Sequence, residues 1–199
     1  MVLGITGGVG AGKSVILSYL KEKHGAVILE ADEIAKHLLE PGQAGNREIR
    51  SIFPPELFAE DGQIRREEMA AYIFRNPEKR QEMNAIVFPL VKAFIQEEIA
   101  KHKPEELVVL EAALLIEEHY DEICHKMWYI YSSEENRRKR LKENRGYSEE
   151  RIQAMFKSQL SEKQFKEGCD VVIDNDKRLE ETYAQVEGEI QAWKDTMEI

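Results

Sequence analysis

The chain alternates short apolar runs with longer stretches in which apolar residues recur every three or four positions. The short runs are typical of buried strands, and the recurring pattern is typical of helices that bury one face. We expect strands at Val2 to Ile5, Ala26 to Glu30, Leu107 to Leu110, Met127 to Tyr131 and Val171 to Ile173. Strands that alternate with helices predict an α/β fold, in which a five-stranded parallel sheet carries helices on both faces. Ligands in such sheets bind beyond the carboxyl ends of the strands.

The stretch between the second and third expected strands is helical throughout. Its helices are expected to break at Phe53-Pro54-Pro55, Asp61-Gly62, Asn76-Pro77 and Phe88-Pro89. Apolar positions there, such as Met69 and Val91, predict core packing rather than cofactor contact. We therefore expect a nucleotide-binding core of residues 1–32, 104–132 and 168–199, a helical insertion of residues 33–103, and a helical lid of residues 133–167.

Residues 7–14 read Gly-Gly-Val-Gly-Ala-Gly-Lys-Ser, which matches G-x-x-x-x-G-K-[ST] at every fixed position. Closely spaced glycines allow backbone N–H groups to surround a phosphate, and the helix that follows adds the positive end of its dipole. The lysine supplies charge for the β- and γ-phosphates, and the serine hydroxyl can ligate Mg²⁺. The motif therefore predicts binding of ATP and Mg²⁺ by Gly8, Gly10, Ala11, Gly12, Lys13, Ser14 and Val15.

A plain turn and a dinucleotide-binding loop both fit these residues less well. A plain turn would not need so many glycines, since each one costs conformational entropy on folding. A dinucleotide-binding loop requires G-x-G-x-x-G, whereas Gly8, Gly10 and Gly12 give G-x-G-x-G.

Two carboxylates follow expected strands and are candidates for chemistry. Asp32 comes directly after the second strand, where it either caps the next helix or acts as the base that accepts a proton from a hydroxyl acceptor. Glu111 ends the third strand, where it either faces solvent or helps to organise Mg²⁺.

Cationic and amide side chains complete the candidate site. Ser132-x-x-Glu135 reads as a capping box, and the helix after it concentrates Arg and Lys in an otherwise acidic chain. Some of these cations pair with glutamates on the helix surface, but Arg140 and Arg145 are expected to contact phosphates when the lid closes. Three arginines of the helical insertion, Arg65, Arg66 and Arg75, either hold an anionic acceptor or are simply solvated. Asn175 after the last strand either touches an adenine or shapes a turn.

Composition narrows the classes of partner. The 199 residues carry a formal net charge of −10, which disfavours binding to nucleic acid or to an anionic membrane surface. The two cysteines form no C-x-x-C motif, and no apolar run approaches the roughly 18 residues that span a bilayer. We expect a cytoplasmic protein that acts on a small molecule, as a monomer or a weak homo-oligomer.

Several separate motifs together make the chain resemble the dephospho-coenzyme A kinases along nearly its whole length. The motifs are Gly4 to Ser14, Glu30-Ala31-Asp32-Glu33-Ile34-Ala35, Gly62-x-x-x-Arg66, Met83 to Pro89, Glu111 to Glu117, Arg140 with Arg145, Gln159, and Asp170 to Asn175. The chain departs from the family pattern at Phe88 (usually His), Ala113 (usually Pro), Gly146 (usually Asp) and Lys177 (usually Gly).

The resemblance implies ATP-dependent phosphorylation of the ribose 3′-hydroxyl of dephospho-coenzyme A, the last step of coenzyme A synthesis. It implies catalytic roles for Asp32, Lys13 and Arg140, with nucleotide contacts from Arg145 and Asn175. The implied acceptor-binding residues are Asp32, Arg66, Asn84 and Glu111, and the implied metal-binding residues are Ser14 and Glu111. The alternatives are a kinase for another nucleoside or nucleotide, and a nucleotide-dependent regulatory protein without turnover.

Overall fold

The computed structural model describes residues 1–196, which form two compact units. The first unit combines Met1–Leu29 with the chain from His102 onward, and the second is Glu30–Lys101. Five strands build the sheet of the first unit: β1 (Val2–Thr6), β2 (Val27–Glu30), β3 (Val108–Glu111), β4 (Lys126–Tyr131) and β5 (Val171–Asp174). The strands are parallel and their order is β2-β3-β1-β4-β5, which confirms the predicted sheet.

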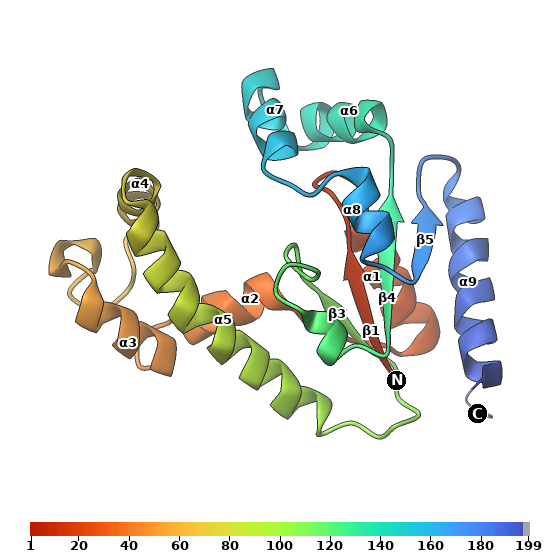
Figure 1. Ribbon diagram of the computed structural model, residues 1–199, viewed down its shortest axis with the longest axis horizontal. Helices are drawn as coiled ribbons and strands as arrows, with labels where there is room; N and C mark the ends of the chain where they lie inside the picture. The colour runs from red at the N-terminus through yellow and green to blue at the C-terminus, as the bar shows by residue number, and fades with distance from the viewer. Residues whose placement is uncertain (197–199) are drawn as a thin grey trace. The chain divides into compact units, whose positions relative to one another are not determined.

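Successive side chains along each strand point to opposite faces of the sheet, and helices cover both faces (Figure 1). Leu3 and Ile5 on β1 and Trp128 on β4 belong to one large core with α1 (Lys13–His24) and α9 (Leu179–Thr196). On the opposite face, Phe165 of α8 (Glu162–Glu167) stacks on Tyr129 with ring centroids 4.8 Å apart. This two-sided burial explains why the strands read as continuous apolar runs.

Two further helices of the first unit follow β4. Helix α6 (Glu134–Arg145) ends at Gly146, whose φ of 62° suits a glycine, and α7 (Glu149–Lys157) follows. The predicted capping box is wrong by one residue, because the side chain of Ser133 rather than Ser132 accepts the Asn136 N–H at the start of α6. Ser132 is instead buried and donates its hydroxyl hydrogen to Asp176.

The second unit is helical, with α2 (Ala31–Leu38), α3 (Ala44–Ile52), α4 (Arg66–Arg75), α5 (Pro77–Ile99) and a 3₁₀ turn at Pro55–Leu57. Ile49, Phe53 and Met69 are buried in its own core. The buried Asn46 side chain donates to the carbonyl oxygens of Leu39 and Gly62, which ties the turns of this unit together.

The expected break at Phe88-Pro89 is wrong, because α5 runs through Pro89 to Ile99. Proline removes one helical hydrogen bond, but Val87, Val91 and Ile95 line one buried face on both sides of it. Burial of that face offsets the lost bond, since most helical stability in proteins comes from tertiary packing.

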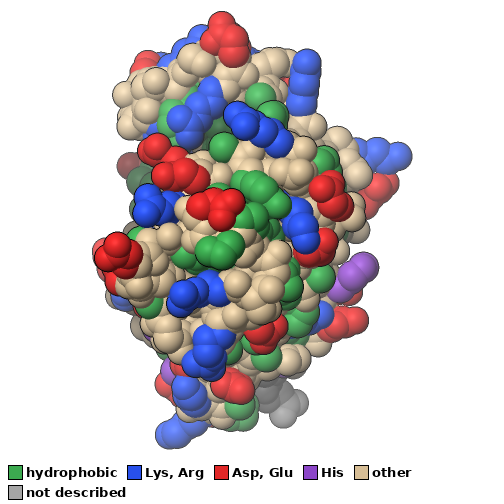
Figure 2. Space-filling view, turned by 90° about the vertical axis from the view of Figure 1, so that its left-hand side faces the viewer, with side chains coloured by type: hydrophobic (Ala, Val, Ile, Leu, Met, Phe, Trp, Pro, Cys, Tyr) green, Lys and Arg blue, Asp and Glu red, His purple; other side chains and the backbone are tan. Residues whose placement is uncertain are grey.

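The surface carries charges of both signs. On the face drawn in Figure 2, Lys and Arg side chains are interleaved with Asp and Glu and do not form one continuous basic area. Within residues 1–196, none of the helices has the length and apolar character needed to span a membrane.

Candidate functional site

The glycine-rich loop lies between the carboxyl end of β1 and the start of α1. Gly10 and Gly12 have φ values of 80° and 90°, a left-handed conformation that favours glycine. A Cβ at Gly7 would lie 2.6 Å from the carbonyl oxygen of Ile130, so a side chain cannot fit there. Gly12 is the N-cap of α1 and offers no capping side chain, so the first N–H groups of the helix are available to an anion.

Lys13 and Glu111 meet at the base of this loop. The Lys13 ammonium donates to the Gly7 carbonyl oxygen at 2.8 Å and lies 3.3 Å from Oε1 of Glu111. The register of the sheet explains the approach, because Ile5 of β1 is aligned with Glu111 of β3. Ser14 and Val15 lie in the first turn of α1, where both are exposed. The structure thus brings together the lysine, the serine-bearing turn and the carboxylate that the sequence placed at the phosphate site.

Arg140 and Asn175 brace the same loop from α6 and the end of β5. The Arg140 guanidinium donates to the carbonyl oxygens of Gly10, Ala11 and Asn175 and to the Ser132 hydroxyl. The Asn175 side-chain amide donates to the Ala11 carbonyl oxygen at 2.7 Å, and a Cβ at Gly12 would collide with that amide. Both predicted residues therefore reach the loop, where they bond to its carbonyl oxygens.

Arg145 does not join this group. It is exposed at the end of α6, and its hydrogen bond to the Tyr147 hydroxyl lowers the pKa of that tyrosine. Across residues 1–196 it makes no hydrogen bond to the loop.

Sequence reasoning missed Arg137, whose Nε donates to the Val9 carbonyl oxygen at 2.9 Å. Arg137 and Arg140 are three residues apart on α6, a spacing that places two side chains on the same helix face. That spacing was the available signal, because a helix that presents Arg140 to the loop also presents Arg137.

Asp176 fixes the start of α6 beside Asn175. Its Oδ1 accepts hydrogen bonds from the Ser132 hydroxyl, the Ser133 backbone and hydroxyl, and the Asn136 amide. Burial alone would raise the pKa of Asp176, but these hydrogen bonds outweigh it and lower the pKa to about 2.

We expect Asp176→Ala to destabilise the protein by about 1–3 kcal/mol near neutral pH, the cost of losing hydrogen bonds to a charged group. Because the folded pKa is depressed, this stabilisation is complete above pH 3.8 and disappears as the pH falls toward 2. Melting temperatures of both proteins, measured by circular dichroism, should therefore converge over that range. Asp195→Ala, which removes an exposed carboxylate from α9, is the control. A gap in melting temperature that does not change with pH would contradict the assignment.

In the second unit, Asp32 is exposed in the first turn of α2. The helix begins at Ala31 with Glu30 as its N-cap, so the capping role considered for Asp32 is wrong. Asn84 lies half-buried on α5, and Arg66 begins α4.

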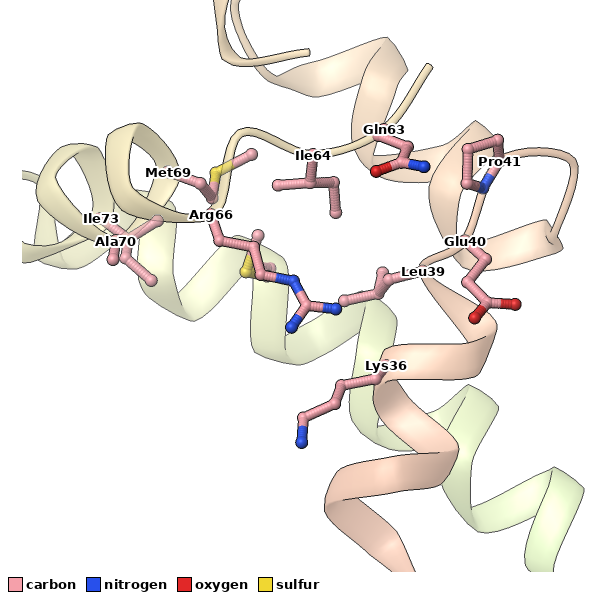
Figure 3. A pocket seen from close by; sticks show the side chains of 11 residues that line it. Lys36, Leu39, Glu40, Pro41, Gln63, Ile64, Arg66, Met69, Ala70 and Ile73 are labelled. Carbon is pink, nitrogen blue, oxygen red and sulfur yellow. The ribbon is translucent and has the colours of Figure 1, made fainter. Parts of the chain in front are cut away.

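A cavity of about 620 Å³ lies within the second unit, and Arg66 and Lys36 are on its wall. In Figure 3 the two cationic side chains extend into the same region, while the Glu40 carboxylate points away from them. The remaining wall is largely apolar and is formed by Leu39, Pro41, Ile64, Met69, Ala70, Ile73 and Met83, with Gln63 at one side. The cavity therefore combines cationic groups with a long apolar surface.

A phosphate-binding loop between β1 and α1 of this five-stranded sheet defines a P-loop protein of the nucleotide-kinase type. The family model of the dephospho-CoA kinases matches residues 1–181. A dephospho-CoA kinase from Oceanobacillus iheyensis is 33% identical to the chain, and the alignment covers 97% of the chain and 98% of that relative. A dephospho-CoA kinase from Shouchella clausii is 32% identical, with coverage of 94% of the chain and 95% of that relative. A crystal structure from Thermus thermophilus is similar, with a TM-score of 0.83, 26% identity and coverage of 96% of this chain and 97% of that one.

The chain therefore belongs to the dephospho-CoA kinase family.

Proposed function

We propose that the protein transfers the γ-phosphoryl group of ATP to the ribose 3′-hydroxyl of dephospho-coenzyme A, yielding coenzyme A and ADP. In this step the bond between the γ-phosphorus and the bridging oxygen of ATP breaks, and a bond forms from that phosphorus to the acceptor oxygen. The acceptor proton passes to a base. The observation that carries the proposal is the phosphate loop with Lys13 and Glu111 at its base, in a chain whose relatives are named dephospho-CoA kinases.

We assign the base to Asp32, because it is an exposed carboxylate in the segment that resembles the family's acidic motif. The loop N–H groups and Lys13 would hold the triphosphate. Bound Mg²⁺ would neutralise phosphate charge, and the Ser14 hydroxyl and Glu111 would be its protein ligands. Within the described residues there is no group of three or more His, Cys, Asp or Glu side chains arranged to hold a metal ion.

Arg140 and Arg145 remain proposed phosphate contacts, with residues 133–167 acting as the lid. Arg140 already contacts the loop, so only a small movement of its side chain would be needed to reach a bound phosphate. For Arg145 the proposal requires a movement of α6 and α7, since the side chain is exposed. Asn175 remains a proposed contact on the adenine side of the site.

The cavity of the second unit supports the proposal that residues 33–103 bind the acceptor, with Asn84 contributing from α5. Dephospho-coenzyme A carries a diphosphate and a long flexible arm, and the cavity offers Arg66 and Lys36 next to an apolar wall. Cations of this kind suit a diphosphate, and apolar side chains suit an arm that leaves water. We further propose a cytoplasmic enzyme, monomeric or weakly self-associating, that uses a small-molecule substrate and binds neither nucleic acid nor membranes.

Arg66→Ala is expected to raise the KM for dephospho-coenzyme A roughly tenfold, the cost of one charge-assisted contact, and to leave the KM for ATP unchanged. Initial-rate kinetics with each substrate varied in turn measure this split. Arg80→Ala, which removes an exposed arginine of α5 that does not line the cavity, is the control. An equal rise in both KM values would argue against a specific acceptor contact.

The proposed reaction is tested by incubating the protein with ATP, Mg²⁺ and dephospho-coenzyme A and separating the products by chromatography. Equal amounts of coenzyme A and ADP would support it. ADP without coenzyme A would indicate another acceptor, which a panel of nucleosides and nucleotides would identify. ATP binding without any ADP would instead favour a regulatory protein.

A further inference from the structure

Three hydrogen bonds form a ring at the backbone of Val9 in the phosphate loop. The Val9 N–H donates to the side-chain oxygen of Gln159 at 3.1 Å, and Nε of Arg137 donates to the Val9 carbonyl oxygen at 2.9 Å. Nη2 of Arg137 closes the ring by donating to the same Gln159 oxygen at 2.9 Å. Three segments meet here: the loop, the first half of α6, and the turn that follows α7.

Arg137 is held differently from the neighbouring Arg138. Its guanidinium lies 4.4 Å from the centroid of the Phe156 ring, and its hydrogen bonds go to uncharged oxygens. Burial lowers the pKa of Arg137, since the charged form is partly removed from water. The Arg138 guanidinium lies 5.3 Å from the centroid of the same ring, but it forms ion pairs with Glu134 and Glu149. A partly buried cation bonded to neutral groups keeps its charge available to the phosphate site, whereas the charge of Arg138 is offset by carboxylates.

Two glycines of the phosphate loop allow Arg137 to come close to it. A Cβ at Gly8 would collide with the Arg137 guanidinium, and a Cβ at Gly10 would lie 2.9 Å from the Arg137 carbonyl oxygen. The absence of side chains at these positions therefore lets α6 pack directly on the loop. These glycines thus make room for a protein contact in addition to any role in phosphate binding.

We propose that Arg137 and Gln159 are positioning residues that hold the backbone of Val9, and through it the phosphate loop, in the conformation that binds ATP. The backbone N–H and the carbonyl oxygen of Val9 are both bound by side chains of the lid segment, which leaves the N–H groups at the start of α1 for the phosphates. The clamp also couples the loop to both helices of the lid segment, so a movement of α6 and α7 would reach the loop through Val9. The inference rests on the proposed use of the loop for ATP.

The test is titration calorimetry of ATP with Mg²⁺ in the absence of acceptor, on the full chain and its variants. Arg137→Ala and Gln159→Ala should each weaken ATP binding roughly tenfold, the size expected for loss of hydrogen bonds that involve a charged group. Arg137→Lys should recover only part of the loss, because a lysine keeps the charge but cannot reproduce the planar fork. Arg138→Ala removes the same charge from the next position and should leave ATP binding unchanged.

Coupling between the two residues separates a clamp from two independent effects. In the double variant Arg137→Ala/Gln159→Ala, ATP binding should be little weaker than in the worse single variant. Steady-state kinetics should show a raised KM for ATP and an unchanged KM for the acceptor, a split that a general loss of stability would not produce. Additive losses, or undiminished ATP binding in Gln159→Ala, would overturn the inference even if Arg137→Ala failed to fold. Failure of the unaltered protein to bind ATP would instead overturn the proposed function.

Discussion

Asp32→Asn is expected to lower the turnover number by a factor of roughly 10² or more, the usual size of a general-base contribution, with ATP affinity nearly unchanged. Asparagine has almost the same shape as aspartate but cannot accept the proton of the acceptor hydroxyl at neutral pH. The carboxylate is exposed in the first turn of α2, so the substitution should cost little stability. Rapid-quench measurement of coenzyme A formation, combined with ATP titration, would separate turnover from binding.

Glu33→Gln is the matched control for Asp32→Asn. Glu33 is the next residue, is also exposed, and pairs with Lys36 on the surface of α2. Loss of this carboxylate should have little effect on turnover, because exposed ion pairs contribute little energy. Equal activity of Asp32→Asn and the unaltered protein would remove Asp32 from the mechanism. A large loss of ATP affinity in Asp32→Asn would instead point to a role in the nucleotide site.

The sheet could be predicted from sequence because its central strands β1, β3 and β4 are buried on both faces, and the edge strands β2 and β5 are also largely apolar. Continuous apolar runs follow from this burial, and no observed strand end differs from the expected one by more than one residue, which is within the normal uncertainty of boundaries. The phosphate loop could be predicted for a related reason, since its glycines are required by local backbone geometry at Gly10 and Gly12. Sequence patterns were sufficient wherever neighbouring residues alone determined the local structure.

The predictions that failed depended on tertiary context. Pro89 normally ends a helix, but the buried face of α5 extends across it. Ser132 and Ser133 are equally good caps by type, and Asp176, more than forty residues away, binds both of them. The approach of Arg137 to Val9 likewise depends on how α6 packs on the loop, which residue type alone does not reveal. A chain read from local patterns yields candidate residues, while packing decides which of them meet.

Lys13→Ala is expected to reduce kcat/KM by roughly 10²–10³, the range seen when a donor aimed at developing charge is removed. The ammonium lies 3.3 Å from Glu111 and would contact the phosphates, so its loss has two effects. The triphosphate loses a cation, and the negative charge of Glu111 at the base of the loop is no longer offset by Lys13. ATP titrated without Mg²⁺ should therefore bind much more weakly to this variant. Lys21→Ala, an exposed lysine on the same helix, is the control.

Combining Lys13→Ala with Glu111→Ala distinguishes these two effects. If repulsion from Glu111 contributes to the loss, the double variant should bind Mg²⁺-free ATP better than Lys13→Ala alone, because the repelling carboxylate is gone. Turnover with Mg²⁺ should nevertheless stay low, since the proposed metal-organising carboxylate is also missing. Recovery of turnover in the double variant would contradict the role proposed for Glu111, and equal Mg²⁺-free binding in both variants would show that Lys13 acts on the phosphates alone.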